Sequence, residues 1–155
     1  MSKKVPFERF SDDQQKQYER EARLQYGPQI VNESVNRWNS YSEARRDAIM
    51  AEGNAVYSDL AQAMLSGEPA TSPAVQAILT RWHNHLRHFY EPTLDILRGL
   101  GELYNSNPAF IAFFDRLHPD LPQYLQDSIA QYVDDLEYAE IVRLLAQDEA
   151  ERGRI

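Results

Sequence analysis

Proline, glycine and helix-capping residues divide this sequence into segments of helical length, and no segment between them resembles a β-strand. Ser11 and Gln14 form a capping-box pattern, in which each side chain can bind a backbone N–H at the start of a helix. We expect that helix to run to Gly27, because glycine readily takes the left-handed conformation that ends helices. Pro28 can open the next helix, since the first helical position does not use its N–H. This second helix should end in the NSYS stretch at residues 39–42.

The middle of the chain contains similar start and stop signals for helices. Ser42 is placed to cap a long helix that Gly67 would close. Gly53 interrupts this helix at a cost of about 1 kcal/mol relative to alanine, so we expect a bend or a close contact there. Ser72, followed by a proline, should open another helix. That helix must end before Pro92, because the residue that precedes a proline is disfavoured in the helical conformation.

The last part of the chain predicts three more helices, over about residues 93–104, 107–117 and 121–136, with an extension of the third to Leu145 left open. Residues 147–155 are mostly charged, and we expect them to fray. The sequence therefore predicts an all-α fold of about seven helices. Because the loops are short and two or three helices are long, we expect a compact array with ridges-into-grooves packing rather than a symmetrical four-helix bundle.

Length and composition limit the organisation and location of the protein. A chain of 155 residues can bury one sizeable hydrophobic core, which predicts a single domain over residues 1–155. The sequence contains no cysteine, which excludes disulfides, thiolate metal sites and cysteine nucleophiles. It has neither the apolar segment of a signal peptide nor an apolar run near the roughly 20 residues that cross a bilayer. We therefore expect a cytoplasmic protein that does not contact membranes.

The charge distribution argues against nucleic-acid binding. The formal net charge is −8, and no clustered basic face is evident in the sequence. Proteins that bind duplex DNA or RNA gain most of their affinity by neutralising phosphates with lysine and arginine. We therefore expect no nucleic-acid partner.

The segment RWHNHLRHFYEP, residues 81–92, concentrates aromatic and histidine side chains. On a helix, Trp82, His85 and Phe89 share one face, whereas His83 points roughly 160° away from His85. His85 and His88 could share a metal ion, but a site needs further ligands, and no HExxH or Glu-xx-His pair is present. The sequence thus predicts no metal. Two interpretations stay open: a core histidine at 85 flanked by solvated histidines, or the wall of a pocket.

Motifs of catalysis are also missing from the sequence. It contains no GxSxG motif, no glycine-rich phosphate-binding loop and no Ser/His/Asp spacing typical of a hydrolase. The neighbouring Asp134 and Asp135 point to different parts of a helix surface and are interpreted as a solvated face. We therefore expect neither an enzyme nor a cofactor.

Several blocks of the sequence together resemble a known family. They read YEREARLQYGPQIVNESVNRWNSY, LAQAMLSGEPATSPAVQAI, HLRHFYEP and LGELYNSNPAFIAFFDRLHPDLPQYLQDSI, in this order. In order and spacing they are similar to the TipAS antibiotic-recognition domain, over roughly residues 8–133. The resemblance implies a globin-like helical array with a deep cleft for bulky peptide-like or polyaromatic antibiotics. It places the domain core at about residues 8–136, and it leaves about 137–155 as a C-terminal helical extension.

The departures from that family shape the functional hypothesis. Some members capture a thiopeptide covalently through a cysteine that would fall at or beside Pro92, and this chain has no cysteine. The chain begins near the start of the ligand-binding domain, so the resemblance implies a stand-alone form that sequesters its ligand rather than controlling transcription directly. His85 and Tyr90 match the family pattern, whereas Trp82 stands where many members have histidine.

The leading hypothesis is noncovalent binding of a bulky, partly aromatic, antibiotic-like small molecule in a cleft between helices. The predicted ligand-binding residues are Trp38, Tyr41, Trp82, His85, Phe89, Tyr90, Tyr104, Phe113 and Tyr124. One alternative is a tetrapyrrole, haem or bilin, with a ligand among His85, His88 and His118. Another is an interaction module in which the acidic last helix contacts a partner. The oligomeric state stays open, with a contact through that helix as one option.

Overall fold

A computed structural model describes residues 27–153, which form six α-helices and no strand. The all-α prediction is confirmed for this part of the chain. The helix expected over residues 11–27 falls almost entirely on residues 1–26, which lie outside the described part. The helices are α2 (Pro28–Ser40), α3 (Glu43–Leu65), α4 (Pro73–Leu86), α5 (Leu94–Tyr104), α6 (Pro108–Asp115) and α7 (Leu121–Arg152).

Side-chain caps fix the helix starts at the predicted positions. The side-chain oxygens of Ser42, Ser72 and Thr93 each accept a hydrogen bond from the backbone N–H three residues later, at 3.1, 3.3 and 3.2 Å. Asn107 caps α6 through its side-chain oxygen in the same way. Gly67, just after α3, has a φ of 86°, which explains the glycine at this stop. The predicted starts of α3, α4, α5 and α6 are therefore confirmed, whereas α7 runs beyond its predicted end.

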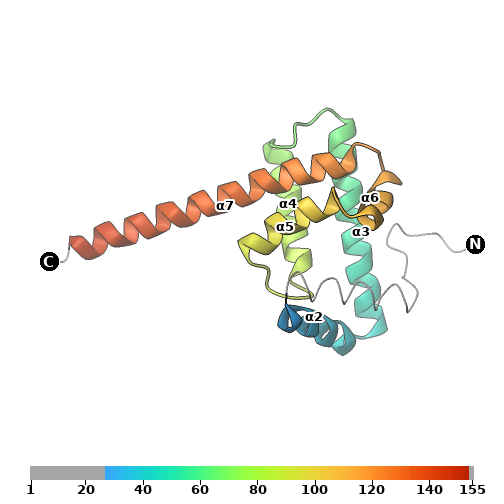
Figure 1. The fold of residues 1–155 in the computed structure, drawn as a ribbon, viewed down its shortest axis with the longest axis horizontal. Helices are drawn as coiled ribbons and strands as arrows, with labels where there is room; N and C mark the ends of the chain where they lie inside the picture. Colours follow the sequence, from blue (N-terminus) through green and yellow to red (C-terminus); the bar gives the residue numbers. More distant parts are fainter. Residues whose placement is uncertain (1–26, 154–155) are drawn as a thin grey trace, which may run out of the picture.

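The hydrophobic core is built around the first half of α7. Its buried face contributes Leu121, Leu125, Ile129 and Val133, and α3, α4, α5 and α6 all pack against this helix. Figure 1 shows α5 lying along α7, with α3 and α4 beside each other. The close approach of α5 uses Gly101, where an added Cβ atom would lie 3.0 Å from Cγ2 of Ile129. These contacts hold α3 and α4 in fixed positions, and the middle of α3 and the end of α4 carry part of the candidate site.

The second half of α7 extends away from the body as a free helical arm (Figure 1). Arg98 of α5 pairs with Asp134 at 2.9 Å and with Glu137 at 3.1 Å, and every residue from 138 to 153 is exposed. The exposed residues include four large hydrophobic side chains spaced three and four apart: Tyr138, Ile141, Val142 and Leu145. Among the described helices, none is both long and apolar enough to span a bilayer.

The expectation that residues 147–155 fray is wrong for residues 147–152, which are helical. Side-chain pairs one turn apart explain the difference, because such pairs stabilise a helix even without tertiary contacts. Arg143 pairs with Glu140 at 2.6 Å, and Arg152 pairs with Asp148 at 3.2 Å. The arm also continues a helix that is already nucleated in the core, so it does not bear the cost of a first turn.

Deletion of residues 138–155 should lower the free energy of unfolding by less than about 1 kcal/mol, because the removed side chains from 138 to 153 are exposed. The measurement is a denaturant titration followed by circular dichroism. Leu125→Ala in the buried half of the same helix is the control, and it should cost about 2–5 kcal/mol. A truncation as costly as Leu125→Ala would show that the arm packs on the body.

Candidate functional site

Four of the predicted ligand-binding residues come together where α2, the start of α3 and the end of α4 meet. Trp38 of α2 stacks on Phe89, with ring centroids 5.6 Å apart and an interplanar angle of 23°. His85 contacts the edge of the same Phe89 ring at 5.6 Å. The Tyr41 hydroxyl donates a hydrogen bond to the backbone carbonyl of His88 at 2.5 Å. We call Trp38, Tyr41, His85 and Phe89 the junction cluster; all but His85 are partly exposed.

Three other predicted residues belong to a second aromatic group inside the body. Trp82 is fully buried, and its ring lies 6.4 Å from that of Tyr104, which is 4% exposed. Phe113 is partly exposed and packs against this core. Burial raises the pKa of the Tyr57 hydroxyl, which lies 3.4 Å from the Tyr104 hydroxyl. Trp82 and His85 share a helical face in the sequence, but the structure divides them between the core and the junction cluster.

The two remaining predicted residues are partly buried and pack against the same hydrophobic core. Tyr90 is partly buried against the core. The Tyr124 hydroxyl donates a hydrogen bond to the Glu68 carbonyl at 2.7 Å, which ties α7 to the loop after α3. The structure therefore distributes the nine predicted residues over several places and joins four of them in the junction cluster.

His83 points away from His85 as predicted, but the surroundings of His83 differ from the expectation. His83 is buried and its Nδ1 lies 2.8 Å from the Tyr132 hydroxyl of α7. The expectation of a solvated His83 is wrong because α7 covers that face of α4. His85 is buried, as the core-histidine interpretation predicts. His118 lies in the turn before α7, where its Nδ1 accepts a hydrogen bond from the Asp120 N–H at 3.0 Å.

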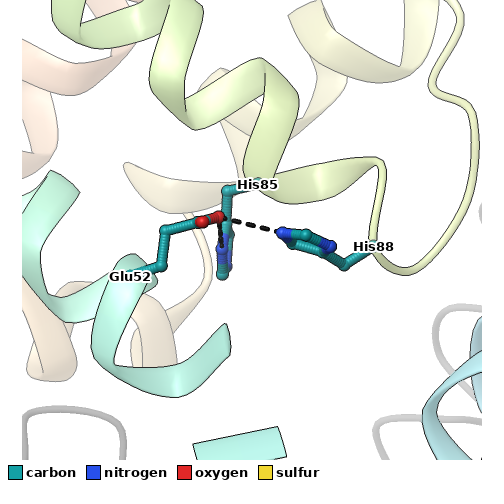
Figure 2. A group of neighbouring side chains, drawn as sticks. All are labelled: Glu52, His85 and His88. Carbon is teal, nitrogen blue, oxygen red and sulfur yellow. Dashed lines mark hydrogen bonds and ion pairs between the residues drawn. The ribbon is translucent and has the colours of Figure 1, made fainter. Parts of the chain in front are cut away.

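Figure 2 shows Glu52, His85 and His88 pointing toward one another, and sequence reasoning missed Glu52. Its Oε1 atom lies 3.0 Å from Nδ1 of His85 and 3.1 Å from Nε2 of His88. The three potential ligand atoms all lie within 4.8 Å of one another, and no other group of three His, Cys, Asp or Glu in residues 27–153 meets this criterion. We call these residues the Glu-His-His cluster.

Gly53, next to Glu52 on α3, makes room for the His85 ring. A Cβ atom added at Gly53 would lie 2.9 Å from Nε2 of His85 and 3.0 Å from Cε1. The close contact predicted for this glycine is therefore confirmed. Gly53 was the feature of the sequence that pointed to the cluster, because a glycine inside a long helix indicates that another group approaches the helix backbone.

Burial lowers the pKa of His85, and this effect exceeds the opposing effect of Glu52, so the ring is neutral at pH 7. Its contact with Glu52 is then a hydrogen bond from Nδ1–H to the carboxylate. The Arg45 guanidinium lies 3.4 Å from Nδ1 of His88. Since arginine can only donate, Nδ1 of His88 accepts and its Nε2–H donates to Glu52. The Glu52 carboxylate thus accepts two hydrogen bonds while its side chain stays 45% exposed.

Trp82→Ala should lower the free energy of unfolding by about 3–5 kcal/mol, because it removes a fully buried indole from between α3, α4 and α5. Trp38→Ala, at a partly exposed position, should cost less than half as much. Chemical denaturation of both variants, followed by circular dichroism, measures the difference. A loss below about 1 kcal/mol for Trp82→Ala would contradict its assignment to the core.

Comparison with protein families gives a match to the TipAS antibiotic-recognition domain over residues 18–132. A solved structure of TipAS in complex with nosiheptide, described as part of a thiopeptide antibiotic multidrug resistance system from Streptomyces lividans, superposes with a TM-score of 0.71. The two chains are 26% identical, and the superposition covers 84% of this chain and 90% of that chain.

Curated relatives include three named transcriptional regulators. The chain is 32% identical over 124 residues to the HTH-type transcriptional activator mta of Bacillus subtilis, covering 79% of this chain and 48% of the relative. It is 28% identical to the regulator SkgA of Caulobacter vibrioides, covering 85% and 54% of the two chains. It is 30% identical to the activator TipA of Streptomyces coelicolor, covering 79% and 49%. The chain thus spans about half the length of these relatives.

Proposed function

This chain belongs to the TipAS antibiotic-recognition family, and we propose from that premise that it binds a bulky, partly aromatic, antibiotic-like small molecule without catalysing a reaction. The observation that carries the proposal is the partly exposed stack of Trp38 on Phe89, directly beside the histidines and the carboxylate of Glu52. Stacked aromatic surface next to a few polar groups is the usual composition of a site for a small organic molecule. The nosiheptide complex of TipAS supports this class of ligand.

The chemistry of the junction cluster indicates what kind of ligand would fit. Trp38 and Phe89 offer flat faces to aromatic or heteroaromatic rings. The exposed side of Glu52 can accept hydrogen bonds from amide N–H groups, and the Tyr41 ring forms one edge of the same region. A peptide-like molecule that contains several aromatic rings carries both kinds of group. Because the sequence has no cysteine, the proposed binding is noncovalent.

The remaining predicted residues divide by burial. Trp82 and Tyr104 are buried in the core, so we assign them to packing within the proposal. Tyr90, Phe113 and Tyr124 are partly exposed, and we keep them as secondary candidates. The match covers only about half the length of the relatives named as transcriptional regulators, so the proposal concerns only ligand binding.

Nosiheptide binding, measured by isothermal titration calorimetry, tests the proposal. Trp38→Ala and Phe89→Ala should each weaken binding by about 1–3 kcal/mol, the usual loss when an aromatic anchor of an interface is truncated. Tyr138→Ala is the matched control, because it removes an aromatic ring that is 70% exposed on the arm. Its affinity should equal that of the unmodified protein.

Tryptophan fluorescence gives an independent measurement. The chain has two tryptophans, so Trp82→Phe leaves Trp38 as the sole reporter. Nosiheptide should quench this emission as it binds. Unchanged affinity in both Trp38→Ala and Phe89→Ala would place the ligand elsewhere. Absence of binding by nosiheptide and by a panel of other bulky aromatic antibiotics would refute the proposed function.

A further inference from the structure

We propose that Glu52, His85 and His88 form a binding site for one divalent transition-metal ion of the zinc class. Two imidazole nitrogens and one carboxylate oxygen are ligands that zinc accepts, and three protein ligands leave a fourth position for water or another molecule. Neither the family match nor the relatives assign a metal to these positions. The site shares Glu52 and His85 with the region proposed for the antibiotic, but its test uses the ion alone, so the two proposals can fail separately.

The geometry lies close to what such an ion requires. In a tetrahedral site with bonds of about 2.0–2.1 Å, ligand atoms are roughly 3.3 Å apart. Oε1 of Glu52 lies 3.0 Å from Nδ1 of His85 and 3.1 Å from Nε2 of His88. The separation of the two nitrogens is at most 4.8 Å. Rotations of the partly exposed His88 and Glu52 side chains can close the set around one ion, while His85 stays in place.

The backbone holds the three ligands on a rigid frame. Glu52 lies in the middle of α3, and His85 lies in the last turn of α4, the helix that packs against α3. The Tyr41 hydroxyl bonds the carbonyl of His88 and so fixes the turn that follows α4. Gly53 leaves the space in which the His85 ring lies against α3. A glycine inside a helix is destabilising relative to alanine, and this ring position is what the glycine permits.

The charges around the cluster affect the binding of an ion. The Glu52 carboxylate attracts a cation. The Arg45 guanidinium, which lies 3.4 Å from Nδ1 of His88, repels a cation. A metal on Nε2 of His88 requires the proton on Nδ1, which faces Arg45. Arg45 is exposed, so its side chain can move toward solvent when the ion enters. Removing Arg45 should therefore strengthen metal binding, an effect that nonspecific surface binding would not show.

Cobalt(II) added to chelator-stripped protein is the probe, because its visible absorption intensifies in four- or five-coordinate sites. We expect one equivalent to bind with a dissociation constant in the micromolar range, and zinc chloride to displace it. Glu52→Gln and His88→Gln should each weaken cobalt binding about 10-fold or more, because even the loss of a group that only hydrogen-bonds a metal ligand lowers metal affinity by about 10- to 100-fold. Arg45→Ala should strengthen binding severalfold. His118→Gln, which alters a histidine outside the cluster, should bind like the unmodified protein.

Both ligand substitutions lie at partly or fully exposed side chains, and circular dichroism verifies that each variant is folded. Absence of one-equivalent binding at 100 µM cobalt would refute the site. Unchanged affinity in the folded Glu52→Gln and His88→Gln proteins would refute it equally, because it would show adventitious binding elsewhere. Loss of metal binding in the folded Glu52→Gln and His88→Gln proteins would support the site whatever their nosiheptide affinity, because the antibiotic proposal is tested separately by Trp38→Ala and Phe89→Ala.

Discussion

The burial of one face of α7 is the constraint on which the rest of the structure depends. Leu125, Ile129 and Val133 are fully buried, and each such side chain contributes roughly 1.5–3 kcal/mol through removal from water. Four other helices share this face, so none of them is held independently of α7. α3 and α4 also pack directly against each other, so their relative positions depend on that contact together with the shared contact to α7. Because Glu52 lies on α3 and His85 on α4, the polar cluster is fixed by a hydrophobic surface that it does not contact directly.

The sequence predicts the helix starts well because they are determined locally. Ser72 and Thr93 cap their helices through the backbone of residues three positions away, so a short window contains both partners. Partners that are distant in the sequence behave differently. Glu52 is separated from His85 by 33 residues, and its exposed position on α3 gives no sign of a histidine partner. Only the neighbouring Gly53 indicated that another group approaches the helix there.

The stripe of Trp82, His85 and Phe89 shows why helical periodicity alone does not locate a site. Periodicity predicts that the three side chains share a face, but it does not predict how far the neighbouring helices cover that face. In the structure the covered part ends near His85, so Trp82 is enclosed by the core while Phe89 reaches α2 and stacks on Trp38. The same limit applies to His83, whose burial depends on the position of α7. The sequence pattern identifies such residues by their type. Whether each of them packs in the core or lines a site depends on how the helices are arranged in the folded protein.

The free arm of α7 determines how this molecule moves through solution. Residues 138–152 extend about 22 Å beyond the body as a helix with a rise of about 1.5 Å per residue. A body with such a rod attached has a larger frictional coefficient than a sphere of the same mass. A single chain should therefore elute early from a sizing column, at a volume where a globular protein of greater mass would be expected. Sedimentation equilibrium and light scattering depend on mass rather than on shape, and these methods separate elongation from association.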